Sequence, residues 1–215
     1  MYLHPVTSAK TQAKWEIKEM AKRISISKTS AAASLTGLGS NVTGAAFTLT
    51  ANDAGDALAH LITARNDSAT DHSGKTIALV GTGPNGEPQT ETLTAPGTSA
   101  TVTSTKYFLT LTSATPSATI GADTFDIGWA AASVSAWFPH NTALPAFQVG
   151  IGCDVTSGSP TYTVQHTFGG AAHNDATLAA KTATAYALLE VPALASRLTF
   201  SAAGGVDFNS IQAGA

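Results

Sequence analysis

The chain has 215 residues, of which 43% are hydrophobic and 12% are charged, and its formal net charge is −3. The hydrophobic content is enough for a folded core and argues against a disordered chain. The small negative charge excludes an overall basic surface for nucleic acid. A surface with so little charge is weakly protected against association, which favours a protein that packs against other subunits.

The single cysteine and the lack of long apolar runs limit the chemistry and the location of the protein. Cys153 has no partner for an internal disulfide or a multi-cysteine metal site. Free cysteine is commonly buried, so we predict a buried strand position, with an intermolecular bridge as the alternative. The N-terminus has no apolar segment typical of a secretory signal, and no run of about 18 apolar residues predicts a membrane span.

The first 46 residues differ in composition from the rest and are predicted to form a basic N-terminal arm and a linker. Residues 8–23 suggest a short helix or an extended arm, 23–27 a strand, and 31–46 a linker or a loop over a partner. The basic residues of this segment could form a solvated face or an arm that docks on an acidic neighbouring subunit. Binding of nucleic acid is the least favoured alternative. We take five of these residues as interface candidates: Lys14, Trp15, Lys18, Lys22 and Arg23.

Residues 47–133 read as strands punctuated by turns and are predicted to form a first β module. Alternation predicts strands at 47–50, 76–82, 89–95, 101–115 and 123–129. The sequence Gly83-Pro84-Asn85-Gly86 predicts a tight turn, because Asn-Gly is a strong hairpin signal. Residues 54–62 could form one or two helical turns after a cap at Asn52 or Asp53.

Residues 134–215 repeat this pattern and are predicted to form a second β module. Alternating strands are expected at 146–156 and 161–168, joined by a turn at 157–160. A loop through Gly169, Gly170 and Asn174 follows. Residues 197–203 and 206–214 are expected to form a closing pair around Gly204-Gly205. The fold class is therefore all-β, with one or two antiparallel β-sandwich or jelly-roll-like modules and a short N-terminal helix or extended arm.

Two stretches of sequence resemble virion structural proteins of tailed bacteriophages. The first stretch is TIALVGTGPNGEPQTETLTAPGTSATVTSTKYFLTLTSATPSATIGADTFDIGW, and the second comprises FQVGIGCDVTSGSPTYTVQHTF, VPALASRLTFSA and SIQAG. Together they lie within residues 75–215. The resemblance implies a capsid decoration or cement protein, or a neck, tail or fibre component, and it transfers no catalytic residues. The loop GGAAHNDATL departs from the family pattern, which suggests contacts specific to this protein.

Two groups of polar residues are candidates for chemical sites. Asp53, Asp56 and His60 would share one face of a helix and could hold a metal, but Asp near a helix N-terminus needs no metal to explain it. Asp71-His72-Ser73 contains the residue types of a catalytic triad, but consecutive residues rarely assemble one, so a polar turn is expected. We predict no catalytic residue, no metal and no cofactor.

One histidine and three aromatic residues are expected in structural or interface positions. Strand alternation puts Tyr162, Val164, His166 and Phe168 on one buried face, so His166 is expected to be a hydrogen-bonded core or interface residue. The remaining interface candidates lie between the two β parts, where they could be core or could anchor an intersubunit contact. These are Trp129, Trp137 and Phe138.

We therefore expect a non-enzymatic structural protein of a phage virion, most consistent with a capsid decoration or cement protein. The alternative is a neck, tail or fibre component with a glycan- or receptor-binding module. Expected partners are the major capsid protein or neck and tail proteins, together with further copies of the chain, for which a trimer is one arrangement. Membrane and nucleic acid are not expected as partners.

Overall fold

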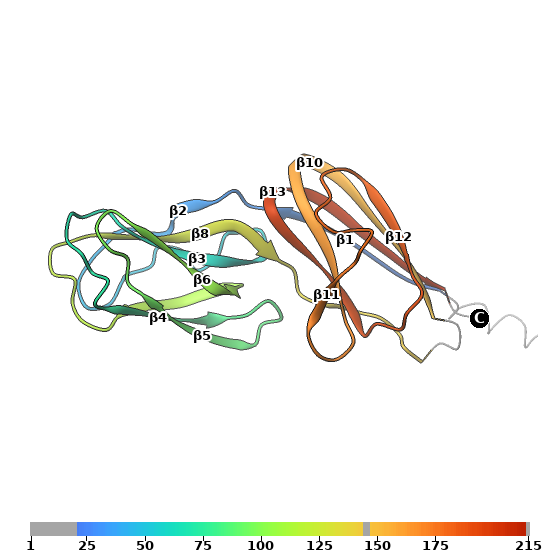
Figure 1. Ribbon diagram of the computed structural model, residues 1–215, viewed down its shortest axis with the longest axis horizontal. Helices are drawn as coiled ribbons and strands as arrows, with labels where there is room; N and C mark the ends of the chain where they lie inside the picture. The colour runs from blue at the N-terminus through green and yellow to red at the C-terminus, as the bar shows by residue number, and fades with distance from the viewer. Residues whose placement is uncertain (1–20, 144–146, 214–215) are drawn as a thin grey trace, which may run out of the picture.

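The computed structural model describes residues 21–143 and 147–213, and its regular structure is entirely antiparallel β-sheet. Figure 1 shows an elongated molecule of two lobes placed end to end. We call residues 34–134 module 1, and residues 21–30 together with the described residues after 134 module 2. The predicted all-β, sandwich-like fold class is confirmed. The described residues include no helix long and apolar enough to cross a membrane.

Module 1 is a sandwich of two sheets. One sheet has the strand order β2-β8-β3-β6 and the other has the order β5-β4-β7. The inner faces of the two sheets share one hydrophobic core, in which the rings of Phe47 and Phe125 lie 5.5 Å apart. The strands are β2 (Ser34–Val42), β3 (Ala59–Asn66), β4 (Thr76–Thr82), β5 (Pro88–Thr94), β6 (Thr101–Phe108), β7 (Thr110–Pro116) and β8 (Phe125–Val134).

The β4–β5 hairpin follows directly from the sequence pattern. Ile77 and Leu79 are buried while Ala78 and Val80 are exposed, so β4 has the period of two expected for a half-buried strand. Gly86 has a φ of 83° in the connecting turn, a conformation that glycine adopts without steric cost. The predicted strand at 76–82, the turn and the returning strand are confirmed.

Two predictions for the start of module 1 are wrong. Residues 47–50 form no strand; Phe47 is nevertheless buried, and its N–H donates to the carbonyl of Ala114 at 3.1 Å. Residues 54–62 form no helix: residues 54–58 are a loop, and residues 59–62 are the first part of β3. The closely spaced apolar residues there reflect burial of both faces of β3, which lies inside its sheet between β8 and β6 and faces the core.

Module 2 is built from a long two-stranded ribbon that folds back on itself. β10 (Gln148–Thr167) and β13 (Ala195–Ala213) pair along almost their whole length, with register shifts around residues 155–162. One half of the ribbon continues into a layer with the order β12-β10-β13-β1, and the other half pairs with β11 and β9. The additional strands are β1 (Ala21–Ser30), β9 (Phe138–Pro139), β11 (Ala172–Asn174) and β12 (Ala185–Leu189).

The fold of this ribbon corrects two predicted turns. Residues 157–160 and Gly204-Gly205 were expected to join hairpin strands, but each is a bend within one continuous strand. Gly204 has a φ of +147°, and a Cβ added there would lie 2.6 Å from Cδ of Pro160. Each bent half pairs with the other long strand rather than with itself, which explains why local turn signals gave the wrong partners.

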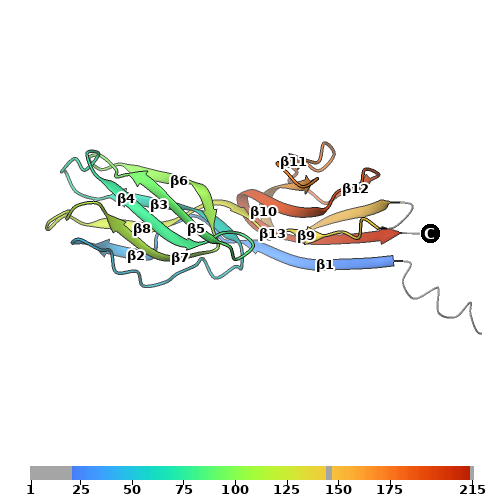
Figure 2. The same cartoon turned by 90° about the horizontal axis from the view of Figure 1, so that it is seen from below.

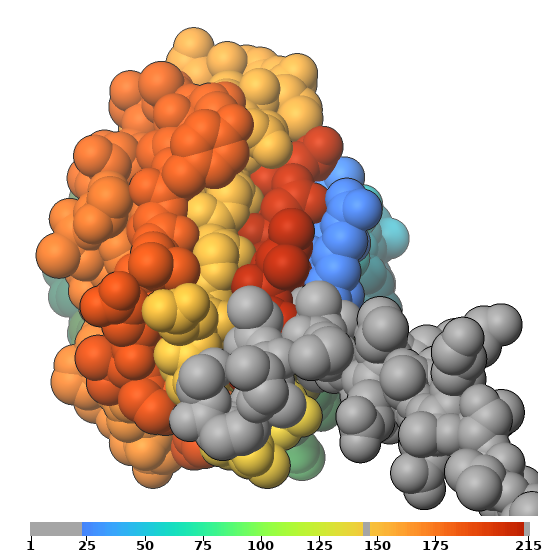
Figure 3. All heavy atoms as spheres, turned by 90° about the vertical axis from the view of Figure 1, so that its right-hand side faces the viewer, coloured from blue at the N-terminus to red at the C-terminus, as the bar shows by residue number. Residues whose placement is uncertain are grey.

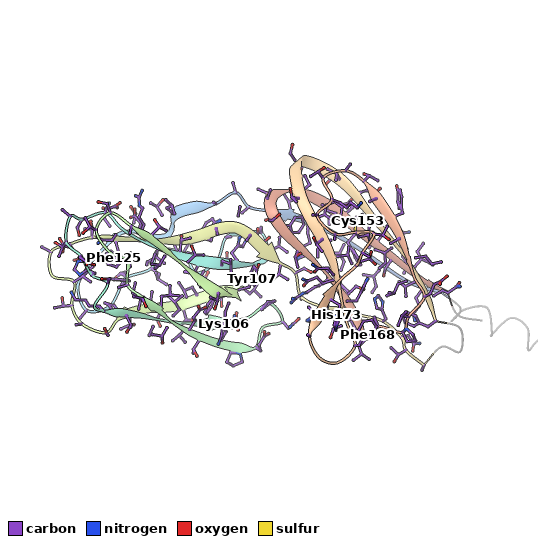
Figure 4. The ribbon with its side chains drawn as sticks, in the orientation of Figure 1. Lys106, Tyr107, Phe125, Cys153, Phe168 and His173 are labelled. Atoms are coloured by element: carbon purple, nitrogen blue, oxygen red, sulfur yellow. The ribbon has the colours of Figure 1, made fainter. Side chains whose placement is uncertain are left out.

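The two layers of module 2 enclose a second hydrophobic core. Phe138 of β9 and Phe208 of β13 come from opposite layers, and their rings lie 5.2 Å apart. Cys153 is free and 0% exposed in this core, as predicted. Figure 4 shows Cys153 within module 2 and Phe125 within module 1. Phe168, predicted on the buried face with His166, is instead exposed at a loop beside His173.

The chain enters module 2 first, passes through module 1 and then returns, so module 1 is an insertion in module 2. Figure 2 shows β1 running along module 2 into module 1. Residues expected as an arm and a linker up to residue 46 therefore include β1 of module 2 and β2 of module 1. The hydroxyls of Ser30 and Ser133 are 2.7 Å apart at the junction, and β8 pairs with β13 at Val134 and Thr199.

Candidate functional site

The N-terminal interface candidates are only partly within the described residues. Lys14, Trp15 and Lys18 lie outside them. Lys22 and Arg23 belong to β1, which pairs with β13. The expected strand at 23–27 is therefore confirmed, and a helix around 8–23 cannot include residues 21–23. The Arg23 side chain is exposed on the outer face of module 2, where it borders the groove described below.

The three aromatic candidates have different positions in the fold. Trp129 is half-buried on β8, covers Gly37, and donates from Nε1 to the carbonyl of Ala32 at 2.9 Å. Phe138 is buried in the core of module 2. Trp137 is half-buried near the junction and belongs to a different set of contacts.

The backbone of Trp137 connects the two modules, and its ring packs against the guanidinium of an arginine. Its N–H donates to Oδ1 of Asn85 in module 1 at 3.0 Å, and the guanidinium of Arg197 in module 2 lies 4.3 Å from its ring centroid. Burial lowers the pKa of Arg197 from its usual value. These contacts explain the half-burial of Trp137 within one chain, and its role in a contact between subunits stays a prediction.

Asp53, Asp56 and His60 do not share a helix face. Asp56 Oδ2 lies 2.8 Å from His60 Nε2, while Asp53 accepts the backbone N–H of Gly55. Burial raises the pKa of Asp56, but its hydrogen bonds with His60 and with backbone N–H groups outweigh this effect, so the net pKa is below its usual value. Within the described ranges, no group of three metal-ligating side chains gathers in space.

The sequence Asp71-His72-Ser73 forms a polar turn, as expected. Asp71 Oδ1 accepts the N–H of Ser73 at 2.8 Å. His72 is buried, and its Nε2 lies 2.9 Å from Oδ2 of Asp123. The histidine thus contacts a carboxylate 51 residues away, and the neighbouring serine hydroxyl is not its partner.

His166 belongs to a buried hydrogen-bonded chain that sequence reasoning identified only in part. Its Nε2 lies 2.9 Å from Asp175 Oδ2, and its Nδ1 lies 2.8 Å from Ser196 Oγ. The same hydroxyl lies 2.6 Å from Nε2 of His140. The predicted hydrogen-bonded core histidine is confirmed, but its three partners were missed because only the fold brings them together. Ser196 lies opposite His166 in the β10–β13 register, His140 follows β9, and Asp175 follows β11.

This buried chain has the residue types of a catalytic triad but a geometry suited to structure. Ser196 is 0% exposed, and its hydroxyl is shared between two imidazoles, so a substrate cannot reach it in this conformation. Burial raises the pKa of Asp175, but the hydrogen bonds from His166 and from the backbone of Leu178 and Thr177 lower it by more than burial raises it. The net pKa of Asp175 is therefore below its usual value. The network therefore holds an ionised carboxylate inside module 2.

An open groove lies on the outer face of module 2. Its volume is about 450 Å³. Its floor is β10 at Gly150 and Gly152, which have no side chains to fill it. Tyr186 of β12 stands on one side and Ile211 of β13 on the other, and both side chains are more than half exposed. No sequence motif signals this groove, because it depends on the pairing of four strands.

The comparisons with protein families and with curated proteins identify no relative of this chain. Neither a protein-family model nor a curated protein matches the chain.

Proposed function

We propose that this chain is a structural protein of a phage virion, and that it acts as a capsid decoration or cement protein that stabilises the particle through subunit contacts. The observation that carries the proposal is the exposed apolar surface of module 2, where Tyr186 and Leu188 of β12 and Ile211 of β13 are 65%, 57% and 53% exposed on the two sides of β10. Contiguous apolar groups on a surface mark interaction sites.

The composition and the shape support the same role. Only 12% of the residues are charged, so electrostatic repulsion between copies is weak. Two sandwich modules are joined by strand pairing and by two chain crossings, which gives a long and stiff molecule suited to spanning neighbouring subunits. The two sequence stretches that resemble virion proteins point to a phage particle as the assembly.

The test is the presence of this chain in purified particles and its effect on their stability. Particles produced with the gene are expected to contain the protein in many copies and to release their genome at a higher temperature than particles produced without it. Localisation by electron cryomicroscopy then separates a position on the capsid surface from one on the neck or tail. Absence of the chain from purified particles would overturn the proposal.

A glycan- or receptor-binding component of the neck, tail or fibre is the second candidate. The exposed ring of Tyr186 beside an open groove favours it, since sugars stack on aromatic rings that edge shallow grooves. A glycan array probed with the whole chain tests this candidate. Binding that is lost in Tyr186→Ala would support it, and an array without any bound glycan would remove it.

A further inference from the structure

The outer face of the β12-β10-β13-β1 layer presents its side chains in three cross-strand rows. Figure 3 looks at the end of module 2, where these strands lie side by side from orange through yellow and red to blue. The pairing register defines the rows, from β12 or β10 across to β1. The rows are Leu188-Gly150-Ile211-Arg23, Tyr186-Gly152-Asn209-Ser25 and Asp154-Asp207-Ser27.

The first two rows contain the walls and the floor of the groove described above, which we call the trough. A Cβ added to Gly152 would lie 3.2 Å from the ring of Tyr186, so the ring leans over the glycine floor. The Tyr186 hydroxyl donates to Oδ1 of Asp154 at 3.0 Å, which fixes the ring as one wall of the trough. Leu188 and Ile211 leave large apolar areas exposed. The trough therefore has a defined shape that suits an inserted apolar side chain.

The third row puts two carboxylates next to each other. Asp154 and Asp207 are directly opposed on β10 and β13, an arrangement that destabilises a sheet unless a cation compensates it. Asp154 interacts with Tyr186 and Asn209, neither of which is charged. Within the described part of the chain, neither aspartate forms an ion pair. The trough thus combines apolar walls with an end that attracts positive charge.

We propose that this trough binds the N-terminal segment, residues 1–20, of a second copy of the chain. This inference rests on the proposed role in assembly and identifies one of its contacts. The segment carries apolar groups that can pack on the trough walls and cations that can pair with its carboxylates. Trp15, Ile17 and Met20 are apolar, and the lysines recur every four residues at Lys10, Lys14 and Lys18. The tryptophan matches the apolar walls, and the lysines match the Asp154–Asp207 pair.

The position of Ala21 and the length of the segment allow the segment to reach the trough of a second copy. Ala21 pairs with Ala213 at the free end of module 2, and β1 runs from there towards module 1. A segment of 20 residues reaches at most about 70 Å, which is enough to lie across the trough of an adjacent molecule.

A complementation experiment with two variants of the full chain tests the proposal. Trp15→Ser removes the apolar anchor of the segment, and Leu188→Asp adds a charge at the edge of the trough, opposite Gly150 of its floor. Because Leu188 is largely exposed, its variant is expected to fold, which circular dichroism checks. By analytical ultracentrifugation, each variant alone is expected to associate at least tenfold more weakly than the unmodified chain.

Mixing the two variants is the decisive step. The Leu188→Asp copy retains its segment and the Trp15→Ser copy retains its trough, so the mixture is expected to form one-to-one heterodimers. Val80→Asp provides a matched control, because Val80 is an exposed apolar residue on β4 of module 1. Its association is expected to equal that of the unmodified chain.

Several outcomes would overturn the proposal. If the mixture remained monomeric, the segment would not bind in this trough. If Leu188→Asp weakened association but Trp15→Ser did not, the trough faces would pack on each other without the segment. A glycan bound in the trough would assign it to a different occupant. If the unmodified chain were found in purified particles despite such results, the proposed function would stand and only this contact would fail.

Discussion

The buried side chain of His166 forms hydrogen bonds with partners that its local sequence pattern does not reveal. His166 could be predicted as a hydrogen-bonded core residue, because strand alternation placed it beside Tyr162 and Val164. Its serine partner could not be predicted, because Ser196 lies on β13 and meets β10 only through long-range pairing. Local pattern therefore identifies which residue is buried, whereas the tertiary register decides what it binds.

The ionised carboxylate of Asp175 makes module 2 sensitive to acid. A carboxyl group whose pKa is lower in the folded than in the unfolded state stabilises the fold above its unfolded pKa, which is about 3.8 for aspartate. This stability is lost as the pH falls through the lower folded pKa. Asp175→Asn is expected to cost about 1.5–3 kcal/mol at pH 7 and to lose less stability than the native chain between pH 5 and pH 2.

Urea unfolding at several pH values measures both effects. Asp71→Asn is a useful control, because Asp71 is an exposed residue of a turn in module 1 and its replacement should leave module 2 unchanged. An Asp175→Asn variant with the full acid sensitivity of the native chain would contradict this account.

The thiol of Cys153 should be chemically silent in the folded protein. Burial raises its pKa to about 12, and the carboxylates of Asp154 and Asp175 contribute. Since the thiolate is the reactive form, we expect no reaction with a disulfide reagent at pH 8 and one equivalent of reaction after unfolding in guanidinium. Rapid labelling of the native chain, or a covalent dimer on non-reducing gels, would show that the thiol is accessible.

At the scale of elements, the sequence was most informative where a strand and its partner are neighbours in the chain. β4 and β5 were predicted correctly because a short turn joins them. β10 and β13 were divided wrongly because their bends contain the same Gly, Ser and Pro residues that normally end strands. A bend and a hairpin turn share this local chemistry, and only the partner strand distinguishes them.

The bend at Gly204 should be sensitive to a single methyl group. Gly204→Ala would bring a Cβ to 2.8 Å from the backbone nitrogen of Pro160, at a φ that L-residues rarely adopt. We expect a loss of about 1–3 kcal/mol in the free energy of unfolding. Gly170→Ala in the same module is the matched control, because a Cβ there meets no atom within 4 Å. Equal stability of the two variants in urea would show that the bend tolerates a side chain.

At the scale of the whole molecule, the order of the modules along the chain differs from the order suggested by the sequence. The basic composition of residues 1–30 indicated a separate arm, but Ile24 and Ile26 pack against the core of module 2. This placement could not be predicted, because the partner of β1 is the last described strand, almost 190 residues later. Composition marked the segment as different without showing where it belongs.

The insertion of module 1 predicts how fragments will behave. Residues 31–134 contain every strand of module 1, so this fragment is expected to fold alone with a cooperative unfolding transition. Residues 135–215 lack β1 and should be unstable, because the packing of Ile24 and Ile26 is lost. Joining residues 21–30 to the C-terminal fragment through a Gly/Ser linker should restore stability, as dispersed amide signals in NMR spectra would report.

A linker-joined fragment that also carries Ile24→Ser and Ile26→Ser is the control, since the extra strand is present but cannot pack. If fragment 135–215 were stable without β1, module 2 would not need β1 for its stability and this prediction would be wrong.

The pairing of β1 with β13 also determines when the protein can finish folding on the ribosome. β1 leaves the ribosome before module 1 and remains without its partner until β13 has been synthesised, while module 1 can fold in the meantime. During this interval Lys22, Arg23 and Lys28 discourage the waiting strand from pairing with other nascent chains, since charged edge strands resist aggregation. A chain whose translation stops before β13 therefore never completes module 2. Such copies would also lack Ile211, which belongs to the exposed apolar surface of module 2.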